Sequence, residues 1–310
     1  MIKTERINYT LLNNSFKEKE LIYPLTKRGF FSEINNLTQA ILYCLEEKIN
    51  LKICSKNWVS GNWSDYFKPV FNEYTGVIPV PNDVFIISRL DKIWLYYHKR
   101  IIKRNVLQND VWNKMHHENF TNKTFHFPEL GIEGNILQAK KKIYEIIINY
   151  NDITIKTIKD NYETHKEFVS KSCGIHIRRG DKVFNKRKEA EFIGINHYIH
   201  KALNIDPNNT KFTICTDDYT VVDELRLEYP NFIFLTFCDK EKKGYDQKNY
   251  NNLQSKKKKS DEVISILLDS QILINSRYFI GTYTSNVSRY VAIVRNNIDC
   301  YSMDDNLNSH

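Results

Sequence analysis

The chain has 310 residues and a net charge of +8, from 45 Lys and Arg against 37 Asp and Glu, and 41% of its residues are hydrophobic. This length predicts two domains of ordinary size, each with enough apolar side chains for a core. No apolar run reaches the length of about 18 residues that a membrane-spanning helix needs, so we expect no membrane span. The first twenty residues lack the apolar core of a signal peptide. We therefore expect a cytoplasmic protein, and the alternative is that a targeting segment was removed or lies outside this chain.

The positive charge alone is compatible with acidic small molecules, anionic surfaces or nucleic acid. Because the basic residues are scattered and no known nucleic-acid-binding motif is present, we expect no nucleic-acid partner. The six cysteines form no CxxC pair, and most lie in apolar runs that are typical of strands. They are predicted to be buried, reduced thiols.

In the first half, residues 1–27 are predicted to form an edge segment or a loosely packed arm. Apolar side chains at helical spacing from 34 to 45 then predict a helix that begins near Ser32. Further predicted elements follow in chain order: a strand at 50–54, an aromatic-rich loop at 57–67 that either lines a cleft or caps a core, and helices at 90–120 and 136–150.

From residue 173 onward, short apolar runs alternate with helical patterns. Strands are predicted at 174–177, 212–215, 232–237 and 278–280, and helices at 195–204, 219–229, 261–275 and 285–295. This alternation indicates a parallel sheet with helices on both faces. The polar stretch 153–172 is the expected crossover between domains 1–165 and 166–310, and the run Lys256–Lys259 is expected to be a solvated loop.

The strand predicted at 174–177 ends in a dense group of charged side chains, namely His176, Arg178, Arg179, Asp181 and Lys182. Ligands of open α/β sheets bind at the carboxyl ends of the strands. Since the planar arginine fork meets two phosphate oxygens at once, this group predicts a site for a pyrophosphate. The alternative is a solvated basic turn.

Three further groups are expected at the same edge of the sheet. Asp217 and Asp218 can bind a metal as a DxD-like pair or, as we favour, cap the following helix and orient the arginines. Asp269, on an apolar helix, either accepts the two N–H groups of a guanine or faces solvent. Thr284 and Ser285 precede a helix, where they can cap it, cradle a phosphate, or do both.

These elements, in this order, resemble the inverting α-1,6-fucosyltransferases, which include the enzymes that core-fucosylate N-glycans and those that fucosylate nodulation factors. The likeness spans roughly residues 28–305 and is most specific in the second half. It is carried by His176–Val183, Glu189-Ala190-Glu191-Phe192, Tyr198, Thr216-Asp217-Asp218, Asp269, and Thr284-Ser285 with Arg289. The chain departs from the family at Gly180, where a threonine is usual, and in the loop before Glu189, which is longer.

The resemblance implies an α/β, two-domain GT-B-like glycosyltransferase with an acceptor-side N-terminal domain and a Rossmann-like donor domain at the C-terminus. It implies transfer of L-fucose from GDP-fucose to a glycan hydroxyl with inversion, in an α-1,6-like linkage. The alternatives are a related enzyme with another GDP-sugar or linkage, and an inactive module that binds GDP or carbohydrate. The acceptor and the oligomeric state are left open.

The resemblance also implies roles for single residues. Arg178 would neutralise the leaving phosphate, and Glu189 would act as the base, with Glu191 as its competitor, while Lys182 tunes that carboxylate. Donor contacts would come from His176, Arg179, Asp269, Thr284 and Ser285, and Asp181 would fix the arginine loop or contact the donor. Support would come from Tyr198, Asp217, Asp218 and Arg289.

No metal ion or other cofactor would be required. The acceptor would lie against the loop that contains Trp58 and Trp63, because aromatic faces stack well on sugar rings.

Overall fold

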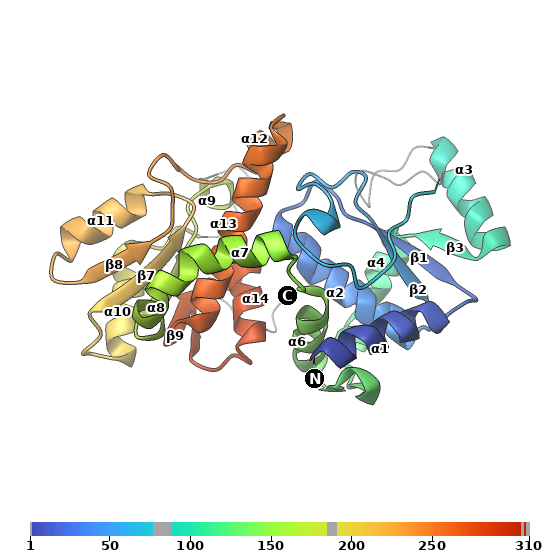
Figure 1. Ribbon diagram of the computed structural model, residues 1–310, viewed down its shortest axis with the longest axis horizontal. Helices are drawn as coiled ribbons and strands as arrows, with labels where there is room; N and C mark the ends of the chain where they lie inside the picture. Colours follow the sequence, from blue (N-terminus) through green and yellow to red (C-terminus); the bar gives the residue numbers. More distant parts are fainter. Residues whose placement is uncertain (1, 77–88, 185–190, 305–306, 308–310) are drawn as a thin grey trace. The chain divides into compact units, whose positions relative to one another are not determined.

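The computed structural model describes residues 2–76, 89–184, 191–304 and 307. The chain divides into two compact units, Met1–Thr154 and Ile155–His310, which follow each other along the colour bar of Figure 1. The division lies before the expected boundary at 165/166, so most of the polar crossover segment belongs to the second unit. No helix in the described part of the chain is long and apolar enough to cross a membrane.

The first unit contains a parallel sheet of three strands in the order β2-β1-β3 (Figure 1). The strands are β1 (Glu20–Pro24), β2 (Asn50–Cys54) and β3 (Arg104–Val106), and a separate antiparallel pair is formed by β4 (Phe125–Phe127) and β5 (Ile132–Gly134). The helices are α1 (Ile2–Ser15), α2 (Phe30–Glu46), α3 (Arg89–Tyr97), η2 (His98–Ile102), α4 (Asn109–His116), α5 (Glu118–Thr121) and α6 (Ile136–Ile147), with 3-10 turns η1 (Trp63–Asp65) and η3 (Pro128–Leu130).

The expectation of a loose arm over residues 1–27 is wrong. This segment forms α1 and then β1, the central strand of the sheet. The helix escaped prediction because its inner face is partly polar: the Asn13 side chain donates to the carbonyl of Leu51 at 3.0 Å and accepts from the Leu51 amide at 2.8 Å. These hydrogen bonds replace the apolar contacts on which a periodicity argument depends.

The other predictions for the first unit hold in outline. The helix predicted from Ser32 is α2, which begins at Phe30, and the strand at 50–54 is β2. The helix predicted at 136–150 is α6, with Ile143, Ile146 and Ile147 buried. The expected helical stretch 90–120 is interrupted by β3, a short edge strand whose sequence Arg-Asn-Val has no apolar pattern.

The second unit is built on a five-stranded parallel sheet in the order β10-β9-β6-β7-β8. Its strands are β6 (Cys173–Ile177), β7 (Lys211–Thr216), β8 (Ile233–Thr236), β9 (Tyr278–Gly281) and β10 (Cys300–Ser302), of which only β10 was not predicted. Helix α7 (Asp152–Tyr162) begins in the first unit and continues into the second. The other helices of the second unit are α8 (Lys166–Ser170), α9 (Asp181–Phe184), α10 (Ile195–Ile205), α11 (Thr220–Glu228), α12 (Gln247–Asn252), α13 (Lys256–Asn275) and α14 (Asn286–Val294), with a 3-10 turn η4 (Glu163–His165).

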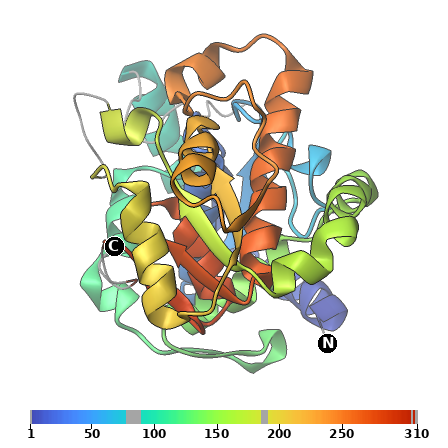
Figure 2. The same ribbon diagram turned by 90° about the vertical axis from the view of Figure 1, so that its left-hand side faces the viewer.

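Helices cover both faces of this sheet, as Figure 2 shows. Alternate residues of β6, beginning with Cys173, pack with α10 and α11 in one apolar cluster. The intervening residues point to the other face, where Gly174 lies against α13 and His176 contacts α14. The predicted Rossmann-like arrangement of the second half is therefore confirmed.

Two smaller predictions have different outcomes. Lys256–Lys259, expected in a loop, form the first turn of α13, where the Ser255 hydroxyl accepts from the Lys258 amide at 3.3 Å and caps the helix. The cysteines are free thiols, and four of the six are buried, as expected.

Candidate active site

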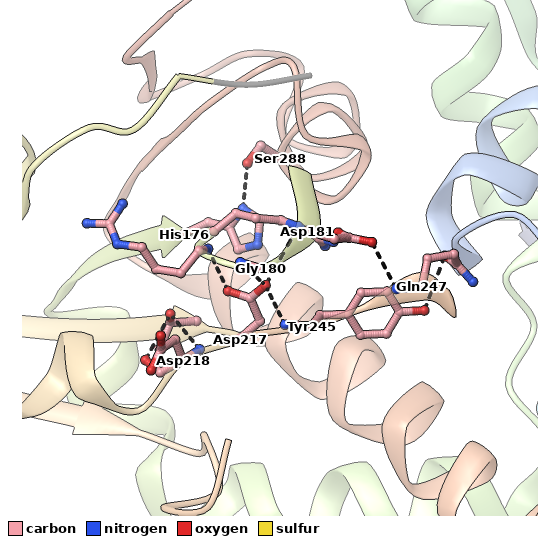
Figure 3. A network of polar contacts seen from close by, with 11 residues as sticks. His176, Gly180, Asp181, Asp217, Asp218, Tyr245, Gln247 and Ser288 are labelled. Carbon is pink, nitrogen blue, oxygen red and sulfur yellow. Dashed lines mark hydrogen bonds and ion pairs between the residues drawn. The ribbon is translucent and has the colours of Figure 1, made fainter. Parts of the chain in front are cut away.

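The predicted site residues that directly follow strands of the second unit lie at the carboxyl ends of three neighbouring strands, β6, β7 and β9. Strand β6 lies between β7 and β9 in the sheet, and Ile177 at its end pairs with Thr216 at the end of β7. The loops that follow these strands therefore meet at one edge, which is where parallel α/β sheets bind their ligands. Figure 3 shows the polar contacts that join them.

Asp217 holds the arginine loop through its backbone. Its carboxylate accepts hydrogen bonds from the amides of Arg179 at 2.7 Å, Gly180 at 3.0 Å and Tyr245 at 3.1 Å (Figure 3). Asp218 instead caps α11: its carboxylate accepts hydrogen bonds from the amide and hydroxyl of Thr220, at 3.0 and 2.8 Å, at the start of that helix. The loop-orienting and helix-capping roles are thus divided between the two aspartates.

Arg178 is held on several sides. Its guanidinium donates to the Asp181 carboxylate at 3.0 Å and lies 3.7 Å from Asp217, and it stacks over the ring of Tyr245 with 5.1 Å to the centroid. The second oxygen of Asp181 accepts from the Gln247 amide at 2.8 Å. These contacts fix the direction of the guanidinium before any ligand binds.

Arg179 has a different environment from its neighbour. It is buried, and its guanidinium lies 4.2 Å from the centre of the Phe192 ring. Burial lowers its pKa from the usual arginine value, and the buried Tyr198 is near enough to oppose that shift. Of the two arginines, Arg178 is therefore the more accessible to a ligand, and the buried Arg179 supports the loop.

His176 and Asp269 are the two residues expected to read a guanine. The His176 Nδ1 atom lies 2.8 Å from the Ser288 hydroxyl, and burial lowers its pKa to about 4, so the imidazole is neutral at physiological pH. Burial raises the pKa of Asp269 to about 7, although the nearby Lys242 opposes this shift. Lys242 itself pairs with Glu262 at 2.9 Å.

The turn between β9 and α14 is fixed from outside, by a residue that the sequence did not single out. The Asp304 carboxylate accepts from the Tyr283 amide at 2.6 Å and from the amide and hydroxyl of Thr284 at 3.2 and 2.6 Å. Arg289 donates to the Tyr283 carbonyl at 2.9 and 3.2 Å. The Thr284 hydroxyl is thus used in the turn, and of the alternatives left open for this residue the structure does not show an N-cap.

Ser285 occupies the N-cap position of α14, and its side chain makes no capping hydrogen bond. The N-terminus of a helix carries a partial positive charge that favours a nearby anion. Of the two hydroxyls expected to face a phosphate, that of Ser285 is the one that fits this role.

The Gly180 position explains a departure from the family pattern. A Cβ atom there would lie 2.0 Å from the carbonyl oxygen and 2.5 Å from the nitrogen of Tyr245. The segment before α12 lies directly on this glycine, with Gly244 at a φ of +92° and its own missing Cβ directed at Gly180. Tyr245 and Gly244 were not predicted as site residues, because the segment around them has no periodic pattern.

Gly180→Thr is expected to displace the 244–247 segment and destabilise the second unit by about 1–3 kcal/mol, because the new side chain would overlap backbone atoms that cannot rotate away. Thermal unfolding followed by circular dichroism measures this. The matched control is Gly194→Ala, whose Cβ would lie 3.6 Å from His197, at ordinary contact distance. Equal melting temperatures for the two variants would contradict the close approach.

Some predicted site residues cannot be placed. Glu189 and the side chain of Lys182 lie outside the described residues. Glu191, the alternative to Glu189 as the base, is exposed. Among the described residues, no group of three or more His, Cys, Asp or Glu side chains is arranged to hold a metal ion. Metal independence stays a prediction.

The expected sugar-stacking role of Trp58 and Trp63 does not fit the structure. Both indoles are buried and stack on each other with 6.2 Å between ring centres, and Phe30 stacks on Trp58 at 5.6 Å. Their faces are covered by neighbouring aromatic rings, so the loop caps the core of the first unit. That outcome was one of the two alternatives for this segment.

Comparisons with known proteins link the sequence to one enzyme family. A family described as alpha-(1,6)-fucosyltransferase N- and catalytic domains matches residues 141–299, about half of the chain. No curated protein matches the sequence.

Several solved structures share the fold. Fucosyltransferase NodZ from Bradyrhizobium is 17% identical over 89% of this chain and 92% of its own, with a TM-score of 0.53. NodZ α-1,6-fucosyltransferase co-crystallised with GDP is 16% identical over 89% and 92%, with a TM-score of 0.52. A point mutant of Arabidopsis thaliana FUT1 in complex with GDP is 9% identical over 99% and 76%, with a TM-score of 0.52.

The fold is therefore that of GT-B-like fucosyltransferases. With the family match over the arginine loop, Asp217, Asp269 and the start of α14, it shows that this chain belongs to the α-1,6-fucosyltransferase family.

Proposed function

We propose that this chain transfers L-fucose from GDP-fucose to a glycan hydroxyl with inversion, in an α-1,6-like linkage. The observation that carries the proposal is the position of Arg178, a partly exposed guanidinium held by Asp181 and Tyr245 at the carboxyl edge of the parallel sheet. One solved NodZ structure was co-crystallised with GDP and another was soaked with GDP-fucose, which supports a guanine nucleotide donor.

In this reaction the bond between the fucose anomeric carbon and the β-phosphate oxygen breaks, and the acceptor oxygen bonds to the same carbon from the opposite face. Negative charge develops on the β-phosphate as the bond breaks. Arg178 would stabilise that charge, and the N-terminus of α14 with Ser285 would add hydrogen bonds. Since both are fixed by the surrounding loops, little reorganisation is needed at the moment of reaction.

The proton of the acceptor hydroxyl would pass to Glu189, with Lys182 orienting that carboxylate. General-base help of this kind typically accelerates a reaction by about 10²–10⁴-fold. Glu191 is the competing base. It is exposed, and it lies two residues after Glu189 in the chain. The choice between the two carboxylates stays a prediction.

Donor selectivity would come from His176 and Asp269. The neutral imidazole beside Ser288 can accept or donate a single hydrogen bond, and the Asp269 carboxylate can accept the two adjacent N–H groups of guanine. With the pKa of Asp269 raised to about 7, guanine binding would favour the ionised form and draw that pKa down. Arg179, Tyr198, Asp217, Asp218, Thr284 and Arg289 would support the site by holding its loops.

We also propose that no divalent metal takes part, because Arg178 and the α14 terminus would supply the charge that a metal otherwise provides. A cytoplasmic location remains a prediction from the sequence.

The test is GDP release from GDP-fucose, GDP-mannose, UDP-galactose and UDP-N-acetylglucosamine, each with a mixture of glycan acceptors and with or without EDTA. We expect release from GDP-fucose alone, undiminished by EDTA. Release of GDP from another GDP-sugar would mean that this sugar nucleotide, and not GDP-fucose, is the donor. Loss of activity in EDTA would contradict metal independence. GDP binding with no release from any donor would favour an inactive binding module.

A further inference from the structure

The segment 89–103 presents apolar side chains to solvent on the first unit. Helix α3 and the π-helical turn η2 lead directly into the edge strand β3. Leu90 is 76% exposed and Ile93 is 69% exposed, and further along Tyr96, Tyr97 and Ile101 are also exposed. Exposed apolar side chains that gather in this way are typical of an interaction surface.

The inner side of α3 is fixed by Leu95, which is 2% exposed and packs with Ile22, Cys54, Tyr74 and Val106. Successive residues of an α-helix are turned by about 100°. Leu90, Ile93 and Tyr97 therefore fall on the side opposite Leu95, and the helix directs a second apolar stripe away from its own core.

The same segment is strongly basic. Residues 89–103 contain Arg89, Lys92, Lys99, Arg100 and Lys103 against a single acid, Asp91. Lys99 pairs with Asp110, and Arg100 lies over the Tyr96 ring at 5.6 Å, while Arg89, Lys92 and Lys103 are exposed. Apolar and aromatic side chains flanked by Lys and Arg are typical of helices that lie in the plane of a membrane surface.

We propose that α3 and η2 form a docking surface for an anionic lipid bilayer. Leu90, Ile93 and Tyr97 would enter the boundary between headgroups and acyl chains, and the basic side chains would contact lipid phosphates. At about 1.5 Å per residue the segment is too short to span the hydrocarbon core, so it would lie flat on the surface.

Charge complementarity favours this partner over two others. A second copy of the chain would bring two basic segments face to face, which costs electrostatic energy. A nucleic acid would match the charges and leave Leu90 and Ile93 without apolar contacts. An anionic bilayer satisfies both kinds of side chain, and the proposal is independent of the reaction that the second unit carries out.

The experiment is flotation of the full, nuclease-treated chain with vesicles. Vesicles of phosphatidylcholine mixed with phosphatidylglycerol should carry the protein, and added salt should weaken the binding, whereas pure phosphatidylcholine should leave it in solution. Two double variants separate the contributions: Leu90→Ser with Ile93→Ser removes apolar contact, and Lys92→Ser with Lys103→Ser removes charge. Each should weaken vesicle binding by about tenfold or more.

The matched control is Leu227→Ser, since Leu227 is 83% exposed on α11 of the second unit and should not alter binding. All the substituted side chains are exposed, so we expect the variants to fold, and melting curves check this. Wild-type protein that stays in solution with the anionic vesicles, or double variants that bind as well as wild type, would overturn the proposal. So would a dimer in sedimentation equilibrium that the apolar variant abolishes.

Discussion

Arg178→Ala is expected to lower the turnover number for fucosyl transfer by about 10²–10³-fold, the cost typical of removing one donor aimed at a developing oxyanion. The Michaelis constant for the donor should change much less, because the charge on the phosphate grows mainly in the transition state. Arg178→Lys should recover part of the activity, since the charge remains while the planar fork is lost. Steady-state kinetics with GDP-fucose and an acceptor measure both constants.

The matched control for this variant is Arg277→Ala. Arg277 pairs with Asp206 at 2.6 Å just before β9, at the opposite end of that strand from the site, and is largely exposed. Its removal should leave turnover unchanged. Full activity of Arg178→Ala would refute the leaving-group role, and equal losses in both variants would indicate a general loss of folded protein instead.

Asp217→Ala is expected to have the largest effect on stability. Three backbone amides, those of Arg179, Gly180 and Tyr245, would lose their acceptor at once. An unsatisfied buried donor costs about 1–3 kcal/mol, and partial access of water reduces this, so we expect a loss of about 3 kcal/mol in the free energy of unfolding. For a unit of this size the melting temperature would fall by about 6–12 °C.

The adjacent aspartate provides the comparison. Asp218→Ala removes a helix cap, which costs about 1 kcal/mol, and it should leave the arginine loop in place. Activity should therefore fall strongly in the Asp217 variant and little in the Asp218 variant. The assignment fails if differential scanning calorimetry gives the two variants the same melting temperature.

The parallel sheet of the second unit could be predicted because its strands are buried on both faces. Runs such as Phe212–Cys215 are almost continuously apolar and stand between helical patterns. The edge strands β3 and β10 were missed for the converse reason, since Arg-Asn-Val and Cys-Tyr-Ser carry no such pattern. Helix α1 was missed because Glu5 and Asn13 take buried positions on its inner face.

The charged residues of the site were found because they follow strands directly, where the fold brings them together. Residues that contact the site from other parts of the chain, away from the ends of these strands, could not be recognised in this way. Asp304 reaches the turn after β9 from beyond β10, and Tyr245 reaches Arg178 from an irregular segment. Their contacts depend on how separate loops pack, which a single sequence does not encode in any local spacing. The one available clue was Gly180, where the family pattern has a threonine.

The contact between Gly180 and the 244–247 segment constrains how this enzyme can change. A larger residue at 180 is tolerable only if the later segment moves, and that segment carries Tyr245, on which Arg178 rests. The two stretches should therefore behave as one inherited unit, in which a substitution on one side is neutral or harmful according to the residue on the other. A chimera that exchanges the arginine loop with that of a threonine-bearing relative should need the 244–247 segment from the same parent.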